Sequence, residues 1–183
     1  MEETPDTADE RDRLLVKRFL EGQGDAASGI VDRYQQRLFN VALRMLHNVQ
    51  DAEDVTQAAF FNAFRELRTY NPRYRFFSWI YRITVNESLN ALKRRKPTVT
   101  LEDQLAIRAP GAAADGAAED EDRVGKALMS LKPDDRAVVV LKHFMSFSYQ
   151  EIADVLEIPV KTVKSRLFTA RERLKLVMRE QGL

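Results

Sequence analysis

The sequence predicts an all-α protein made of two small helical domains joined by an acidic linker, the C-terminal one with a helix-turn-helix. Through most of the 183 residues, apolar side chains recur at intervals of three and four, which is typical of amphipathic helices. A run of valines stands only at 138–140, inside such a helical pattern, and other strand signals are nearly absent. Residues 109–122 hold six alanines, five acids, two glycines and one proline but no large apolar residue, which is a linker composition.

Composition divides the chain into four segments. We expect an acidic tail over 1–12, a first domain over 13–97, a flexible acidic linker over 98–122 and a second domain over 123–183. Each domain is small but long enough to hold a helical core.

The first domain is expected to hold four helices. The first covers about 10–21 and ends near Gly22. The second is marked by apolar residues at helical spacing: Tyr34, Leu38, Val41, Ala42, Met45 and Leu46. The third covers 51–68 and carries acids in its first turn, which favours a helix start. The fourth covers about 75–95 and is stopped by Pro97.

Helices are also expected after the linker, near 123–131, 134–145, 149–156 and 160–180. Ser148 and Glu151 form a capping box, in which each side chain satisfies a backbone N–H of the other residue. Pro159 suits the start of the next helix. The last helix has one continuous apolar stripe: Val160, Val163, Leu167, Ala170, Leu174 and Val177.

A short capped helix, a tight turn and a longer helix with a basic outer face make a helix-turn-helix. The outer face holds Lys161, Lys164, Ser165, Phe168, Arg171 and Lys175. Such a helix fits the major groove, where lysine and arginine contact phosphates and base edges. The alternatives are a generic helical hairpin with a solvated face, and Phe168 packed against the preceding helix.

The net charge of +1 hides a segregation of charge along the chain. Residues 71–100 carry seven bases and one acid, residues 101–122 carry seven acids and one base, and residues 146–183 carry seven bases and five acids. Two basic regions flanking an acidic stretch indicate a polyanion partner that is contacted at two places. The alternative is that these charges only solvate helix faces.

The fourth helix carries a polar stripe, which is spaced by three and four: Arg75, Trp79, Arg82, Asn86, Asn90 and Lys93. Aromatic rings stack on exposed bases and amides hydrogen-bond to base edges, so this stripe suits unpaired nucleic acid. Tyr70, Tyr74 and Phe76 crowd the loop before it. The alternative for Trp79 and these aromatic residues is ordinary core packing.

The helix over 51–68 has a different face. Asp54, Gln57 and Phe61 share one side, beside Glu53. An acidic, amide-bearing face is poor for DNA and suits a protein partner with basic side chains. The alternative is a solvated face with Phe61 in the core.

Four segments carry a resemblance to a known family: DAEDVTQ at 51–57, FSWIYRITVN at 77–86, SYQEIA at 148–153 and PVKTVKSRL at 159–167. With these motifs in this order, the chain resembles the extracytoplasmic-function (ECF, group 4) RNA polymerase sigma factors of the sigma-70 family. The resemblance runs from about Leu14 to Lys175. It implies that the first domain is sigma region 2, which binds the polymerase clamp helices and opens the minus-ten element. The second is sigma region 4, which binds the polymerase flap and the minus-thirty-five duplex.

The residue patterns and the resemblance together predict three groups of site residues. The acidic face, expected to bind polymerase, consists of Asp51, Glu53, Asp54, Gln57 and Phe61. Tyr70 and the polar stripe, from Arg75 to Lys93, are expected to bind minus-ten DNA, with Tyr70 and Asn86 as walls of a pocket for a flipped base. The basic face, expected to bind minus-thirty-five DNA, consists of Lys161, Thr162, Lys164, Ser165, Arg166, Phe168 and Arg171. An anti-sigma factor is an expected further partner.

One other function hypothesis stays open: a helix-turn-helix transcriptional regulator that binds DNA independently of core polymerase. An enzyme is not expected, because acids such as Asp134 and Asp135 lie at helix starts, where capping explains them. Cysteine is absent and His47 and His143 lie far apart, so neither a metal site nor a cofactor is predicted. No apolar run reaches the roughly 18–20 residues of a membrane span. The acidic N-terminus has no export signal core, so a cytoplasmic protein is expected.

Overall fold

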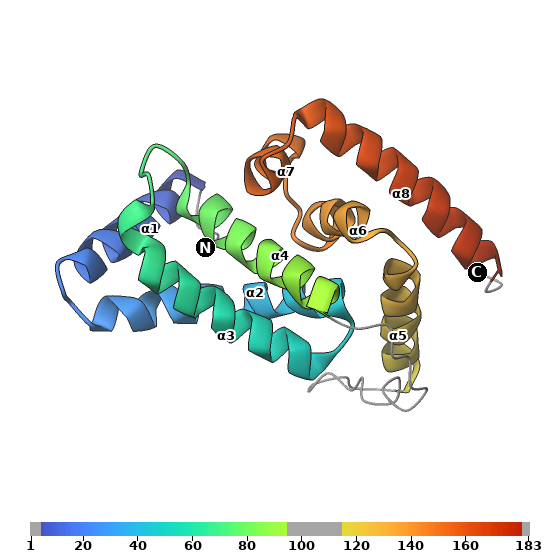
Figure 1. Cartoon of the computed structure of the whole chain (residues 1–183), viewed down its shortest axis with the longest axis horizontal. Coiled ribbons are helices and arrows are strands. Elements are labelled where there is room, and N and C mark those ends of the chain that lie inside the picture. The colour runs from blue at the N-terminus through green and yellow to red at the C-terminus, as the bar shows by residue number, and fades with distance from the viewer. Residues whose placement is uncertain (1–4, 95–114, 181–183) are drawn as a thin grey trace.

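The computed structural model of the chain describes residues 5–94 and 115–180, and every regular element within these ranges is helical (Figure 1). The N-terminal half consists of α1 (Pro5–Leu20), α2 (Asp25–Leu46), α3 (Val49–Glu66), the 3₁₀ turn η1 (Leu67–Thr69) and α4 (Phe76–Arg94). The C-terminal half consists of α5 (Asp115–Met129), α6 (Pro133–Val139), the π-helical turn η3 (Val140–Phe144), α7 (Tyr149–Leu156) and α8 (Val160–Glu180). The all-α prediction is confirmed for the described residues.

The N-terminal core lies between α2, α3 and α4, which run side by side (Figure 1). Leu38, Met45, Phe76 and Ile80 are fully buried there. Helix α3 begins at Val49, two residues before the predicted start, because the Asn48 side chain caps it by accepting a hydrogen bond from the backbone N–H at position 51, at 2.9 Å. These helices therefore start and pack as the apolar periodicity requires.

Helix α1 differs from the expected acidic tail, because it begins at Pro5 and packs on α2. Its Asp12 is only 4% exposed: one carboxylate oxygen accepts a 2.5 Å hydrogen bond from the Tyr34 hydroxyl, and the other lies 2.7 Å from Arg33 Nε. Burial raises the pKa of the Asp12 carboxyl, against the lowering effect of its two partners. A buried acid thus joins the acidic segment to the first domain.

Two further boundaries differ from expectation. Helix α5 begins at Asp115, inside the segment expected as linker, and residues 98–114 of that segment lie outside the described residues. Alanine is the best helix former and acids favour a helix N-terminus, so an alanine- and acid-rich stretch can extend a helix. The expected helix over 134–145 is instead α6 followed by the π-helical turn η3.

The helix-turn-helix forms as predicted from α7 and α8. The capping box is present: Ser148 Oγ accepts from the backbone N–H of Glu151 at 3.2 Å, and the Glu151 carboxylate accepts from the Ser148 N–H at 2.8 Å. Helix α7 ends at Glu157, which adopts a left-handed conformation with φ of 52°. Helix α8 then starts directly after Pro159.

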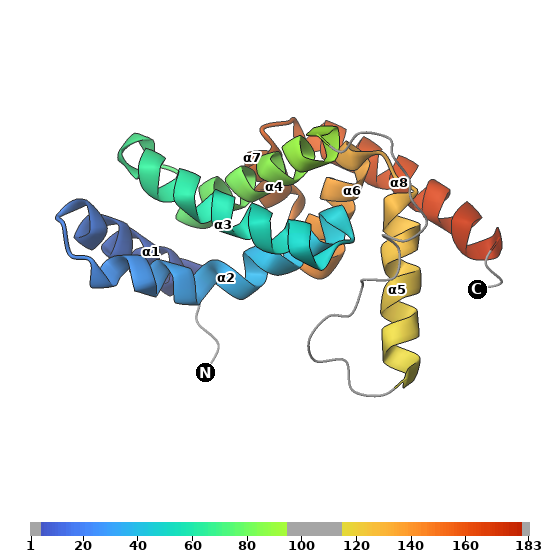
Figure 2. The same ribbon diagram turned by 60° about the horizontal axis from the view of Figure 1, so that its bottom comes forward.

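The two domains pack against each other, with α7 beside α4 in both views (Figures 1 and 2). Arg136 on α6 is 3% exposed at this junction. Its guanidinium donates to the carbonyls of Leu128, Leu131 and Met129 at 2.9, 3.0 and 3.2 Å in its own domain. It also donates to the carbonyl of Met45, at the end of α2, at 2.5 Å. One buried side chain therefore holds the α5–α6 turn and reaches across to the first domain.

We expect Arg136→Met to lower the free energy of unfolding by about 2–4 kcal/mol, because it leaves several buried carbonyls without a donor. Chemical denaturation followed by circular dichroism measures this change. The matched control is Arg173→Met on α8, where the side chain is exposed and the change should stay within about 0.5 kcal/mol. Equal stability of the two variants would contradict the structural role of Arg136.

Candidate nucleic-acid and polymerase interfaces

The acidic face lies on α3 and is open to solvent. Glu53, Asp54 and Gln57 are exposed, and Phe61 is 66% exposed, so Phe61 does not belong to the core. Asp51 is half-buried in the first turn of the helix. The Phe61 ring is accompanied by Arg65 of the same helix, whose guanidinium lies 5.6 Å from the ring centroid.

A groove of about 640 Å³ runs between α2 and α3 beside this face. It is lined by Gln35, Gln36, Phe39, Glu53, Gln57 and Phe60. Two residues of the acidic face, Glu53 and Gln57, thus share the groove with amides and aromatic rings from α2 and α3. The α2 side of this groove was not predicted. Its residues lie on a different helix from those of α3, so the periodicity of α3 gives no information about them.

The polar stripe on α4 is divided by the C-terminal domain. Asn86, Asn90 and Lys93 are exposed, toward the end of the helix. Arg75 and Arg82 are half-buried and pair with Glu151 and Glu157 of the helix-turn-helix. Trp79 is half-buried against Tyr70 and Phe76 of its own domain. Spacing by three and four predicts which residues share a side of a helix, but it carries no information about an element from elsewhere in the sequence that packs beside them.

Tyr70 is 8% exposed, and its hydroxyl donates a 2.6 Å hydrogen bond to the carbonyl of Tyr74. Its ring lies 5.5 Å from Phe76 and 5.6 Å from Trp79, measured between ring centroids. Burial raises the pKa of the Tyr70 phenol to about 12. The phenol therefore stays protonated and serves to fix the loop before α4.

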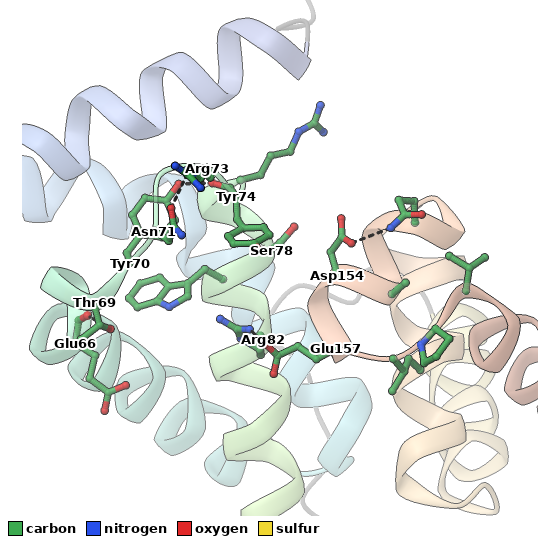
Figure 3. A pocket seen from close by; sticks show the side chains of 17 residues that line it. Glu66, Thr69, Tyr70, Asn71, Arg73, Tyr74, Ser78, Arg82, Asp154 and Glu157 are labelled. Carbon is green, nitrogen blue, oxygen red and sulfur yellow. Dashed lines mark hydrogen bonds and ion pairs between the residues drawn. The ribbon is translucent and has the colours of Figure 1, made fainter.

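Tyr70 and Trp79 line a groove of about 860 Å³ between the two domains (Figure 3). From the first domain, Asn71, Arg73 and Tyr74 also line it, and Tyr74 is 67% exposed. The aromatic residues of this loop were predicted to crowd together, whereas Asn71 and Arg73 were not predicted to belong to the site. The feature that could have identified them is their position in the loop, within three residues of Tyr70.

The basic face occupies the outer side of α8. Lys161, Lys164, Ser165 and Arg171 are exposed, Thr162 is half-buried, and Phe168 is 69% exposed. The alternative in which Phe168 packs against the preceding helix is therefore excluded. A large ring held in solvent among lysines and arginines is available to a thymine methyl or a sugar.

Arg166 differs from the rest of the basic face. It is half-buried, and its guanidinium Nη1 lies 3.8 Å from the carboxylate of Asp134 on α6. The pair ties α8 to α6 within the C-terminal domain. Sequence spacing could not find this pair, because its two members lie on different helices.

Two further features, a cluster of metal ligands and a membrane-spanning helix, are absent from the described part of the chain. Within 5–94 and 115–180, no three histidine, aspartate or glutamate side chains come together as metal ligands would. None of the helices in the same ranges is both long and apolar enough to cross a membrane.

Family models match both domains: sigma-70 region 2 over residues 30–98 and sigma-70 region 4 over residues 121–174. These matches place the chain in the sigma-70 class of transcription-initiation factors. The chain is 35% identical to the RNA polymerase sigma-H factor of Pseudomonas aeruginosa, covering 90% of this chain and 92% of the relative. It is 32% identical to the ECF RNA polymerase sigma factor SigW of Bacillus subtilis, covering 90% and 95%. The chain therefore belongs to the ECF RNA polymerase sigma factors, and the resemblance found in the sequence is confirmed.

Solved structures agree with this assignment. The chain aligns with CnrH, solved in complex with the cytosolic domain of CnrY, at a TM-score of 0.74 and 27% identity over 93% of this chain and 98% of that one. The sigma factor RpoE of Bartonella quintana, solved with the anti-sigma factor NepR, has the same fold at a TM-score of 0.66 and 24% identity.

Phe168→Ala should change the free energy of unfolding by no more than about 0.5 kcal/mol, because its ring is in solvent. Its neighbour Leu167 is 2% exposed and provides the matched comparison. Leu167→Ala should cost about 2–5 kcal/mol. Thermal unfolding of the two variants checks the contrast, and a strongly destabilised Phe168→Ala protein would show that the ring supports the fold.

Proposed function

We propose that this chain binds core RNA polymerase through α3, binds the minus-thirty-five duplex through α8 and captures the unpaired minus-ten strand along α4. The observation that carries the proposal is the presence of three chemically different surfaces on three helices. One is acidic with an exposed phenylalanine, one is basic with an exposed phenylalanine, and one mixes arginine, amides and a tryptophan. Each surface suits a different partner, and membership of the sigma family supports assigning them to one initiation complex.

The basic face of α8 suits duplex DNA. Helix α7 packs against α8 and leaves the basic face of α8 exposed. Helix α8 can therefore enter the major groove with Lys161, Lys164 and Arg171 toward phosphates and base edges. Each lysine that contacts a phosphate releases counterions from the DNA. The slope of the logarithm of affinity against the logarithm of salt concentration therefore steepens by about one unit per lysine. Because Arg166 pairs with Asp134, we assign it to support of α8 rather than to base recognition.

The exposed end of the polar stripe suits single-stranded DNA. Asn86, Asn90 and Lys93 offer two amides and one cation along one side of α4. Stacking one base on an aromatic ring contributes about 1–3 kcal/mol. That is comparable with the few kcal/mol needed to unstack and unpair one base. A pocket at Trp79 and Tyr70 can therefore hold a base that has flipped out, while polymerase supplies the remaining free energy of opening.

The acidic face of α3 and the adjacent groove suit a basic, partly apolar protein surface, which we assign to the polymerase clamp helices. An anti-sigma factor is the further partner we propose, since the sigma factor RpoE, which has the same fold, was solved with the anti-sigma factor NepR, and CnrH was solved with CnrY. A regulator that binds DNA without polymerase is the other outcome. Transcription in vitro with core polymerase, followed by sequencing of the transcripts, distinguishes the two.

The combined variant Asp54→Lys/Gln57→Ala should bind core polymerase at least about tenfold more weakly, because charge reversal at a complementary interface costs more than a kcal/mol. Binding is measured by fluorescence anisotropy of labelled protein, with circular dichroism to confirm that the helices are intact. Glu21→Lys, at an exposed position after α1, makes the same charge change outside the acidic face. Unchanged affinity in the combined variant would remove α3 from the polymerase interface.

Asn86→Ala should leave formation of the closed promoter complex nearly normal but slow promoter melting. Tyr70→Ala should slow melting too, and it should also lower the free energy of unfolding by about 3–5 kcal/mol because the Tyr70 ring is buried. Permanganate footprinting of unpaired thymines follows the melting step in holoenzyme. A premelted template is the control: it should rescue both variants in part if they act on opening. If both variants open the promoter at the wild-type rate, α4 does not bind the minus-ten strand.

A further inference from the structure

Helix α1 packs against the elements that carry the minus-ten site, although the family match does not include it. The match to sigma-70 region 2 begins at residue 30, whereas α1 ends at Leu20. The helix contacts α2, α4 and the turn η1, which leads into the loop that begins at Tyr70. The family match therefore gives no role to α1, while the packing places it directly behind the proposed strand-binding site.

Asp12 is the buried charge at the centre of the contact between α1 and α2. Its carboxylate accepts the 2.5 Å hydrogen bond from the Tyr34 hydroxyl and lies 2.7 Å from Arg33 Nε. Arg33 also donates to the backbone carbonyl of Ala8, one turn earlier on α1, at 3.4 Å. Apolar burial is non-directional, whereas these polar contacts define how deep and at what rotation α1 sits on α2.

Tyr34 links Asp12 to the minus-ten site through a chain of buried rings. The centroid of its ring lies 5.6 Å from that of Phe76, in edge-to-face geometry. The Phe76 ring in turn lies 5.5 Å from Tyr70 and 5.6 Å from Trp79. Protein interiors are close-packed and contain few voids that could absorb a displacement. A shift of the Tyr34 ring is therefore passed on to the two rings that are proposed to hold the flipped base.

Helix α1 also lies beside the Tyr70 loop directly. Burial is the main cause of the raised pKa of the Tyr70 phenol, and the next causes are two charges of α1: Asp9, which raises this pKa, and Arg13, which lowers it. Asp9 and Arg13 form an ion pair with each other, at 2.9 Å. The loop before α4 is thus close to α1 as well as to the rings that Tyr34 contacts.

We propose that Asp12 is a positioning residue for minus-ten recognition: by holding the Tyr34 hydroxyl, it sets the positions of the Tyr70 and Trp79 rings that receive the flipped base. The inference rests on the proposed role of α4 in strand capture. A buried charge gains little net stability over a well-packed apolar group of similar volume. A hydrogen bond to a charged acceptor adds the directionality that apolar packing lacks. Because Asp12 is buried, it acts through Tyr34 rather than by touching DNA.

The first test observes the pocket in the full-length protein without DNA. Tyr34→Phe keeps the ring and removes the hydroxyl. Trp79 is the chain's one tryptophan and lies against Tyr70, so its emission spectrum and near-ultraviolet circular dichroism report on the pocket. Both signals should change in Tyr34→Phe. The matched control is Tyr81→Phe, which should keep them: Tyr81 is as deeply buried, and its hydroxyl contacts the Met145 sulfur at 4.0 Å.

The second test measures base discrimination by the holoenzyme. Melting rates are compared between one promoter and templates that carry single-base substitutions in its minus-ten element. A misplacement of about 1 Å can reduce a rate by up to about 10²-fold. We expect the ratio of the two rates at the flipped base to fall at least about threefold in Tyr34→Phe and to stay unchanged in Tyr81→Phe. A loss of fold stability alone would slow all templates equally and leave this ratio unchanged.

The third test asks whether Asp12 acts through Tyr34. Asp12→Ala should lower the ratio as far as Tyr34→Phe does, and the double variant should lower it no further, because both changes remove the same hydrogen bond. Glu10→Ala makes a similar change at an exposed position of α1 and should leave the ratio at the wild-type value. If Asp12→Ala does not fold, the Tyr34→Phe protein still decides.

A wild-type ratio in Tyr34→Phe holoenzyme would overturn the proposal, as would unchanged Trp79 signals in that variant. An equal fall in Glu10→Ala would indicate a general effect of charge on α1 and would also overturn it. Failure of the proposed function gives a different result, because Asn86→Ala holoenzyme would then melt promoters normally. If Asn86→Ala is slow while Tyr34→Phe discriminates as the wild type does, α4 binds the strand and Asp12 only supports the fold.

Discussion

Helix α4 is packed on more than one side, and this crowding decides which of its residues are free. Phe76 and Ile80 are buried in the N-terminal core, while Arg75 and Arg82 pair with α7. Because residues three and four apart share a side of a helix, the polar stripe runs directly beside the buried one. The stripe cannot move without disturbing the core. Access to it is therefore set by the element that lies on it.

Helix α7 combines buried apolar residues that pack within the C-terminal domain with carboxylates that pair with arginines of the polar stripe. Its buried residues Ile152 and Val155 hold the C-terminal domain together, as a helix-turn-helix needs. Its carboxylates are unfavourable beside a DNA backbone but complementary to arginine. A supporting helix that does not itself need to enter the groove can carry such acids. The same short helix thus supports α8 and pairs with the arginines of the polar stripe.

Much of the fold could be predicted from residues that lie three or four positions apart. Contacts between residues far apart in the sequence could not be predicted in this way. The capping box at Ser148 and the exposure of Phe168 followed from neighbours three or four residues away. Burial of Arg136, whose guanidinium reaches carbonyls in both domains, depends on residues that share no periodicity with it. The close approach of Gly125 on α5 to the ring of His47, at the end of α2, is of the same kind. Sequence spacing defines a surface, but only packing shows whether another domain covers it.

The three surfaces also differ in when they can act. The acidic face of α3 and the basic face with Phe168 are open in the packed chain, whereas the arginines of the stripe are paired. Each of the two ion pairs is partly exposed and contributes at most about 1 kcal/mol. The exposure of the stripe in the packed chain is therefore decided by contacts between the domains and not by the residues of the stripe alone.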